Sequence, residues 1–223
     1  MSSTTSRKFL DQNMQLRILT AGVAIPIALG LIILSWATTA LLILVLLAGA
    51  TYEYVRLVQY ESSSMLNNVL FGVAYLGVPL IMALWLRSQP DGLKWFMLVL
   101  LTTWVTDSMA LFVGKAIGKH KMAPQISPKK TWEGAVGGCI SGSILVLILA
   151  LVLDLEIDGA MILLAMLLPI VAVLGDLLES KLKRRFNVKD SGALFPGHGG
   201  ILDRIDSVIA TLLVTALVVL LFR

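Results

Sequence analysis

Residues 176–207 read DLLESKLKRRFNVKDSGALFPGHGGILDRIDS, and this stretch decides how the rest of the chain is interpreted. It begins in one apolar segment, passes through a run of positive charge, and enters another apolar segment through Asp203 and Asp206. Carboxylates are costly at membrane depth, and those that a membrane protein keeps near its helix ends usually serve its function. The stretch therefore predicts a polar site held at the surface of a bilayer.

Composition places the chain among membrane proteins. It has 223 residues, of which 57% are hydrophobic and 14% charged, and its mean hydropathy is +0.88. A soluble domain carries about 25% charged residues, so we expect an all-α polytopic membrane protein of one domain. The single cysteine, Cys139, excludes a disulfide framework and a cysteine metal site. The net charge of +4 fits an anionic membrane face or a phosphorylated substrate, and we expect no nucleic-acid partner.

The apolar runs predict about seven transmembrane helices, since one crossing takes about 20 residues. The first run, from about 16 to 50, is too long for one span, and we divide it at Ser35–Trp36, where an interfacial tryptophan and two threonines fit a turn. The second span ends in the aromatic belt Tyr52–Arg56. The later spans are expected at 66–86, 93–113, 132–153, 160–178 and 201–222. Residues 1–100 then form a polar tail and a transmembrane scaffold, and residues 101–223 form a catalytic region with two basic loops.

The distribution of basic residues sets the orientation. With the amino terminus in the cytoplasm and seven crossings, fifteen Lys and Arg residues lie inside and three lie outside. This agrees with the excess of positive charge in cytoplasmic loops. We therefore expect an integral protein of a bacterial-type inner membrane, with its amino terminus and its site in the cytoplasm.

The same topology places the membrane-level carboxylates in one layer, at the cytoplasmic leaflet. Two basic loops, at about 114–131 and 181–200, open on that layer, so we expect a polar cavity there. The acidic residues of the layer are Asp107, Glu133, Asp176, Glu179, Asp203 and Asp206.

Spacing within this layer suggests a cation site. Asp176, Glu179, Ser180 and Lys183 stand at i, i+3, i+4 and i+7, which is one face of a helix. Carboxylates from this helix and the next could share Mg²⁺, which is commonly held by one or two carboxylates together with substrate phosphates. The alternative is that the acids only pair with the lysines and arginines of residues 181–185 and anchor the helix ends.

Two helix starts are candidates for binding phosphate. Residues 196–200 (PGHGG) precede the seventh span, so their amides are expected to be open at a helix N-terminus that favours anions. We expect Ser127 to cap the fifth span, with Pro128 at its first helical position. The alternatives are a simple glycine turn and contacts of the lysines with anionic lipid.

Gly134, Gly138 and Gly142 recur at every fourth residue of the fifth span. Small residues at this spacing are typical of close packing between membrane helices, so these glycines are interpreted as scaffold.

Two blocks of the chain resemble the phosphatidate cytidylyltransferases, also called CDP-diacylglycerol synthases. The upstream block runs from Asp107–Ala110 through Gly114–Lys115 and Gly118–Lys119 to SPKKTWEGAVGG at 127–138. The downstream block comprises Ser180–Arg184, Lys189–Asp190 and HGGILDRID at 198–206. Together they cover close to half of the chain. The first hundred residues are similar only in being apolar spans that end in a Tyr-Glu-Tyr belt.

The resemblance implies a reaction in which CTP and phosphatidate give CDP-diacylglycerol and pyrophosphate for phospholipid biosynthesis. It implies Mg²⁺ as cofactor, with K⁺ beside it in some members. Matching the family's motifs assigns Mg²⁺ to Asp176 and Asp203, and we expect Glu179 and Asp206 to complete or orient that site. The remaining catalytic positions are Lys183, Arg204 and Asp206. The substrate-binding positions are Asp107, Lys129, Lys130, Glu133, Ser180, Lys189, His198, Gly199 and Gly200.

Other functions remain open at this stage. A cytidylyltransferase for an ether-linked isoprenoid glycerol phosphate would share the same motifs. A transporter is a second alternative, although transporters usually carry internal repeats and broken helices near the bilayer centre, and the sequence shows no repeat. The oligomeric state is also open, and a homodimer is one of the options.

Overall fold

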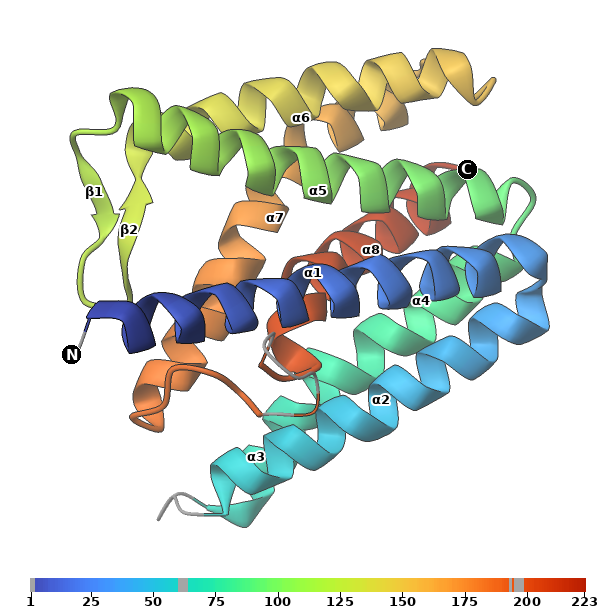
Figure 1. Ribbon diagram of the computed structural model, residues 1–223. Coiled ribbons are helices and arrows are strands. Elements are labelled where there is room, and N and C mark those ends of the chain that lie inside the picture. The colour runs from blue at the N-terminus through green and yellow to red at the C-terminus, as the bar shows by residue number, and fades with distance from the viewer. Residues whose placement is uncertain (1–2, 60–63, 193, 195–198) are drawn as a thin grey trace.

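The structure is a computed structural model that describes residues 3–59, 64–192, 194 and 199–223, with residues 3–18 described as backbone alone. Long helices form a bundle, and a short hairpin stands at one end of it (Figure 1). The helices are α1 (Ser3–Leu34), α2 (Trp36–Val58), α3 (Met65–Gly72), α4 (Val78–Ser88), α5 (Gly92–Ile117), α6 (Trp132–Val152), α7 (Gly159–Arg185) and α8 (Leu202–Phe222), and the strands are β1 (Lys121–Ala123) and β2 (Ser127–Thr131).

The described chain confirms the all-α polytopic architecture. Among the described residues, six helical segments are long and apolar enough to cross a membrane, and the apolar part of α1, Leu19–Leu34, is shorter. One of the six, Met65–Ser88, joins α3 to α4 through a π-helical turn, η1 (Val73–Gly77). Each of the seven expected spans therefore corresponds to a helical segment.

The division of the first apolar run is also confirmed. α1 ends at Leu34 and α2 begins at Trp36, with Ser35 as the N-cap between them. The Ser35 hydroxyl accepts a hydrogen bond from Thr38 N, and Thr38 Oγ1 accepts one from Ser35 N, which is a reciprocal capping box. Local polar chemistry thus turns the chain inside an otherwise continuous apolar run.

The π-helical turn η1 has a local cause. Pro79 follows Tyr75 by four residues, so a regular helix would require an amide hydrogen that proline lacks and would press the proline ring against the Tyr75 carbonyl. The wider turn relieves that conflict. It leaves Tyr75 buried in the interior of the bundle.

The glycines of α6 pack against α5, as the sequence predicts. A Cβ atom on Gly134 would collide with the Ala110 carbonyl oxygen, and one on Gly138 would collide with the Thr106 carbonyl oxygen. Gly142 lies against Thr106 and against Pro169 of α7. The small residues therefore let three helices approach closely.

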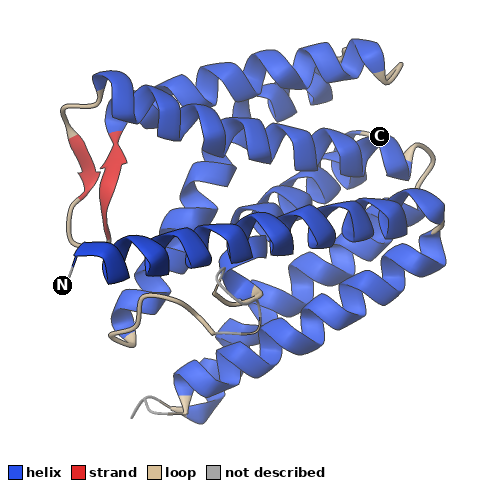
Figure 2. Ribbon diagram, in the orientation of Figure 1, coloured by secondary structure: helices blue, strands red, loops and turns tan. Residues whose placement is uncertain are grey.

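The start of α6 corrects one prediction. Ser127 and Pro128 do not open the helix, because they lie in β2, which pairs antiparallel with β1 (Figure 2). The hairpin continues to Thr131, whose hydroxyl accepts a hydrogen bond from Gly134 N and caps α6. Proline is tolerated in β2 because a two-stranded sheet leaves every strand with a free edge.

α8 is the most buried of the spans, with 50% of its apolar window inside the protein. It packs against α7, α4 and α5. A hydrogen bond of 3.1 Å between Thr103 and Thr211 hydroxyls links α5 to α8 in the interior. The end of α7 and the start of α8 lie at the same end of the bundle as the hairpin, which we call the hairpin end (Figure 1).

Candidate functional site

Asp203, in the first turn of α8, is at the centre of a polar network. Its Oδ2 accepts hydrogen bonds from Gly200 N (2.8 Å), Ser191 N (2.9 Å) and the Ser191 hydroxyl (3.0 Å). Its Oδ1 lies 2.6 Å from Lys183 Nζ. Charge-assisted hydrogen bonds of this kind are the strong ones, so the orientation of this carboxylate is fixed on both sides.

Lys183 joins the last turn of α7 to the first turn of α8. Its ammonium group lies 2.6 Å from Glu179 Oε2 and 2.6 Å from Asp203 Oδ1. Glu179 is 1% exposed, and within the described part of the chain neither of its oxygens accepts a hydrogen bond of regular geometry. The lysine therefore holds a buried carboxylate that has spare acceptor capacity.

Asp176 forms a second pair with the hairpin. Its Oδ2 lies 2.7 Å from Lys130 Nζ, and its Oδ1 accepts a hydrogen bond of 3.3 Å from the Ser180 hydroxyl. Arg184 donates to the Ile126 carbonyl oxygen and so ties the end of α7 to the turn between β1 and β2. The hairpin thus delivers Lys130 to the acidic face of α7.

Two further predicted carboxylates lie near Asp176, Glu179 and Asp203, and we call these five acids the carboxylate cluster. Asp107 on α5 and Asp206 on α8 each lie within electrostatic range of Asp176 and Lys130. Asp206 Oδ1 also accepts a hydrogen bond from Ser207 N at 2.8 Å. Three helices and the hairpin therefore bring charged groups of both signs to the hairpin end.

The remaining predicted positions differ in their exposure and in their contacts. Lys129, Lys189 and Arg204 have exposed side chains, and Gly199 adopts φ +87°, a left-handed conformation that favours glycine. The Gly200 amide does not stand open for phosphate as expected, because Asp203 occupies it. His198 lies outside the described residues.

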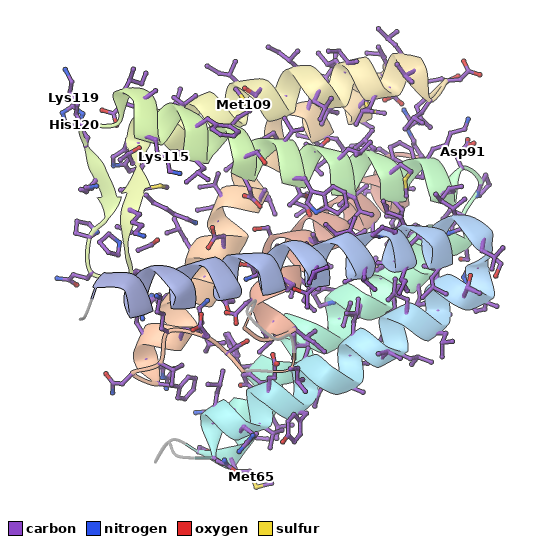
Figure 3. The ribbon with its side chains drawn as sticks, in the orientation of Figure 1. Met65, Asp91, Met109, Lys115, Lys119 and His120 are labelled. Atoms are coloured by element: carbon purple, nitrogen blue, oxygen red, sulfur yellow. The ribbon has the colours of Figure 1, made fainter. Side chains whose placement is uncertain are left out.

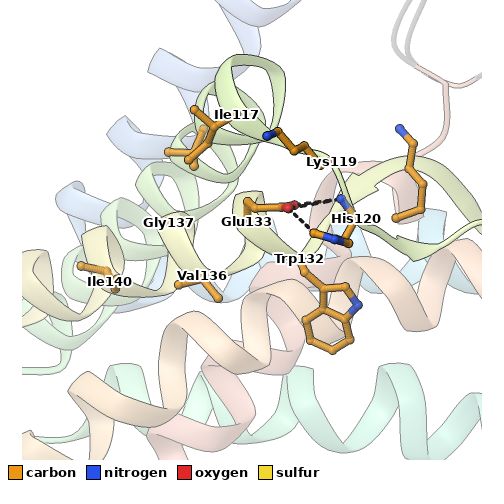
Figure 4. A pocket seen from close by; sticks show the side chains of 10 residues that line it. Ile117, Lys119, His120, Trp132, Glu133, Val136, Gly137 and Ile140 are labelled. Carbon is orange, nitrogen blue, oxygen red and sulfur yellow. Dashed lines mark hydrogen bonds and ion pairs between the residues drawn. The ribbon is translucent and has the colours of Figure 1, made fainter.

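Glu133 turns away from the carboxylate cluster. Its Oε1 lies 2.6 Å from His120 Nδ1, and the same carboxylate accepts a hydrogen bond from His120 N (Figure 4). Both residues line an open groove of about 990 Å³ between α5 and α6, whose lining contains none of the carboxylates of the cluster. Glu133 stays a predicted substrate contact, but its present partner is His120.

Three residues of the site were missed by sequence analysis. Glu53 on α2 is 2% exposed and binds Ser191, and Ser191 in turn binds Asp203. Tyr75 in η1 has a buried hydroxyl without a hydrogen-bond partner among the described residues, and it lies within electrostatic range of Asp176, Glu179, Asp203 and Asp206. A signal existed for Glu53, because an ionisable residue inside a span is a functional candidate by default.

Comparison with known proteins shows the family of the chain. The model of the cytidylyltransferase family matches residues 62–222, which include α7, α8 and the hairpin. The chain belongs to the cytidylyltransferase family. The resemblance seen in the sequence is thereby confirmed.

Individual relatives carry a more specific name. The chain is 33% identical to a phosphatidate cytidylyltransferase of Rickettsia conorii, over 91% of this chain and 89% of that protein. It is 42% identical over 139 residues to the one of Staphylococcus haemolyticus and 40% identical over 140 residues to the one of Brucella abortus. The matched segment spans about half of the latter two, 53% and 52% respectively.

The acidic residues at the hairpin end bear on the expected metal. The described residues contain no group of three or more acidic, histidine or cysteine side chains placed to hold an ion by themselves. Asp176 and Asp203 each face a lysine, and Glu179 has acceptor capacity in reserve. Such a set fits Mg²⁺ that arrives with a polyphosphate, because that ion takes one or two protein carboxylates and completes its shell from phosphate and water.

Proposed function

We propose that this chain transfers the cytidylyl group of CTP to phosphatidate, giving CDP-diacylglycerol and pyrophosphate. The observation that carries the proposal is the pairing of Lys183 with Asp203 and of Lys130 with Asp176, at one end of a helical membrane bundle. The printed names of the relatives support the choice of substrates. Membership in the cytidylyltransferase family supports the reaction type.

The reaction joins two polyanions, so its main requirement is charge neutralisation. An oxygen of the phosphatidate monoester forms a bond to the α-phosphorus of CTP, and the bond from that phosphorus to the bridging β-oxygen breaks, releasing pyrophosphate. The monoester has a second pKa near 6, so it is largely a dianion at neutral pH and needs no general base. The ammonium groups of Lys183 and Lys130 would stabilise phosphate charge as the bond to the leaving group breaks.

Lys183 and Lys130 are both oriented by neighbouring carboxylates. Lys183 is fixed between Glu179 and Asp203, and Lys130 is fixed on Asp176, so each ammonium group keeps its position before the substrate arrives. Fixed charges of this kind need no reorganisation during the reaction. Exposed Lys129, Lys189 and Arg204 would attract the phosphates toward the site.

Mg²⁺, with K⁺ beside it as in some family members, is part of the proposal. Asp176 and Asp203 would hold it, and Glu179 would supply a further oxygen. When bound, Mg²⁺ neutralises the triphosphate and helps pyrophosphate to leave. The charge distribution supports an orientation in a bacterial-type inner membrane in which the hairpin end faces the cytoplasm.

The direct test incubates purified protein in detergent with Mg²⁺, phosphatidate and each of the four labelled nucleoside triphosphates. We expect a lipid-linked nucleotide from CTP alone. Asp203→Asn should lower turnover by about 100-fold or more, because the carboxylate that orients Lys183 loses its charge. Asp154→Asn, at the opposite end of the bundle, is the matched control and should keep wild-type activity. Absence of any lipid nucleotide product from wild-type protein would refute the proposal.

A further inference from the structure

Glu53 is a buried carboxylate that lies outside the matched family region yet reaches the site. It is on α2 and is 2% exposed. Its Oε1 accepts a hydrogen bond from Ile201 N at 3.0 Å, and its Oε2 accepts bonds from Leu202 N and from the Ser191 hydroxyl, both at 3.0 Å. A buried carboxyl group is tolerated only where such partners compensate for its lost hydration.

These bonds place Glu53 at the N-terminus of α8. The first amides of a helix lack partners within the helix and carry partial positive charge, so a carboxylate is a strong cap for them. Here the cap comes from a helix that precedes α8 by 149 residues at the Leu202 contact. α2 therefore fixes where α8 begins.

The surrounding backbone is shaped to fit the Glu53 carboxylate. A Cβ atom on Gly192 or on Gly200 would collide with its oxygens. One turn earlier on α2, Gly49 receives the side chain of Ile201, and a Cβ there would collide with it. Gly192 near the end of α7 and Gly200 and Ile201 before α8 therefore all pack on one face of α2.

Glu53 is coupled to Asp203 through a single hydroxyl group. Ser191 Oγ lies 3.0 Å from Glu53 Oε2 and 3.0 Å from Asp203 Oδ2, so its one proton is shared between the two carboxylates. Glu53 also fixes the Ile201 and Leu202 amides, which come directly before Asp203 in the chain. Both routes lead to the carboxylate that holds Lys183.

We propose that Glu53 is a positioning residue, which sets the orientation of Asp203 and Lys183 through Ser191 and the first turn of α8 without touching substrate. The proposal rests on the proposed function for its kinetic consequence. It also makes a structural prediction that holds whether or not CTP is the substrate.

The test compares Glu53→Gln with wild type in two measurements, activity per folded molecule and hydrogen exchange in detergent. The amide keeps the size of the side chain but turns donors toward the donors of Ser191, Ile201 or Leu202. We expect kcat to fall by roughly 10- to 100-fold, since small displacements of reacting groups are costly. KM for CTP should stay within about threefold, because binding contacts are retained. Exchange should rise in residues 199–206 and remain unchanged in α6.

Two further variants keep the test decisive. Ser191→Ala removes only the hydroxyl bridge, and it should lower kcat with a native melting temperature even if Glu53→Gln does not fold. Glu156→Gln, an exposed carboxylate at the opposite end, should match wild type in both measurements. Wild-type kcat in Ser191→Ala and in any folded Glu53→Gln would overturn the proposal, and so would a rise in exchange spread over all helices. If wild-type protein gives no lipid nucleotide, the proposed function fails, and hydrogen exchange alone then decides the role of Glu53.

Discussion

At the scale of single residues, the Lys183 ammonium group lies between two acids that are withdrawn from water. The side chains of Glu179 and Asp203 are 2% and 5% exposed, and that of Lys183 is 14% exposed. Taking charges out of water costs several kcal/mol per ion, and their mutual attraction repays this only when all partners are present. The free energy of unfolding should therefore fall more when one member of the triad Glu179–Lys183–Asp203 is removed than when the lysine and one acid are replaced together.

Lys183→Met should lower the free energy of unfolding by about 3–5 kcal/mol, because it leaves two buried carboxylates without their cation. The double variant Lys183→Met/Glu179→Met should recover part of that loss, since it removes one orphaned charge. Reversible unfolding in mixed micelles measures both. A double variant less stable than Lys183→Met alone would show that Glu179 is stabilised by something other than the lysine.

At the scale of elements, close packing between α5 and α6 sets the position of the hairpin. The glycine face of α6 lies directly on α5 backbone, and the hairpin connects the adjacent ends of the two helices. Lys130, at the end of that hairpin, then reaches Asp176 on α7. A change in the distance between α5 and α6 would therefore move a charged group of the site as well as loosen the bundle.

Gly138→Ala should destabilise the protein by about 1–3 kcal/mol, because the new methyl group overpacks the contact with Thr106 and Ala110. Gly22→Ala in α1 is the matched control. A Cβ atom there would meet nothing within 4 Å in the part of the chain that the structure describes, and alanine favours helix over glycine by up to about 1 kcal/mol. The same substitution should thus change stability with opposite sign at the two sites, as thermal unfolding in detergent would measure. Equal effects would contradict close packing of α6 on α5.

At the scale of the whole molecule, the two ends of the bundle differ in chemistry. Lys115, Lys119 and His120 lie near the hairpin, whereas Asp91 lies at the opposite end (Figure 3). At that opposite end Arg223 pairs with Asp158 at 2.9 Å and stacks on the Trp95 ring. The Met161 amide and the Arg223 guanidinium lower the pKa of Asp158, so this carboxylate is charged at neutral pH. The asymmetry favours one orientation in a membrane.

Cysteine labelling can check this orientation in intact cells. In a Cys139→Ala background, Glu156→Cys at the opposite end should react with a membrane-impermeant maleimide. Gln125→Cys in the hairpin turn should react only after the membrane is permeabilised. Both side chains are exposed, so a difference in labelling reports the side of the membrane rather than burial. The reverse pattern would place the hairpin end outside the cell.

The sequence by itself determined that the acids gather at one end, because the number of spans and the placement of basic residues set which helix ends share a side of the membrane. It also determined the features that depend on neighbouring residues: the membrane class, the turn at Ser35, and the packing face of Gly134, Gly138 and Gly142. These follow from apolar run length, local capping and helical spacing, which are legible within a few turns of chain. Tertiary structure alone decided that Glu53 caps α8, since the two groups are 148 residues apart at Ile201. It also decided that residues 127–131 pair as a strand, because hydrogen bonds to β1 outweighed the local preference of Ser-Pro for a helix start.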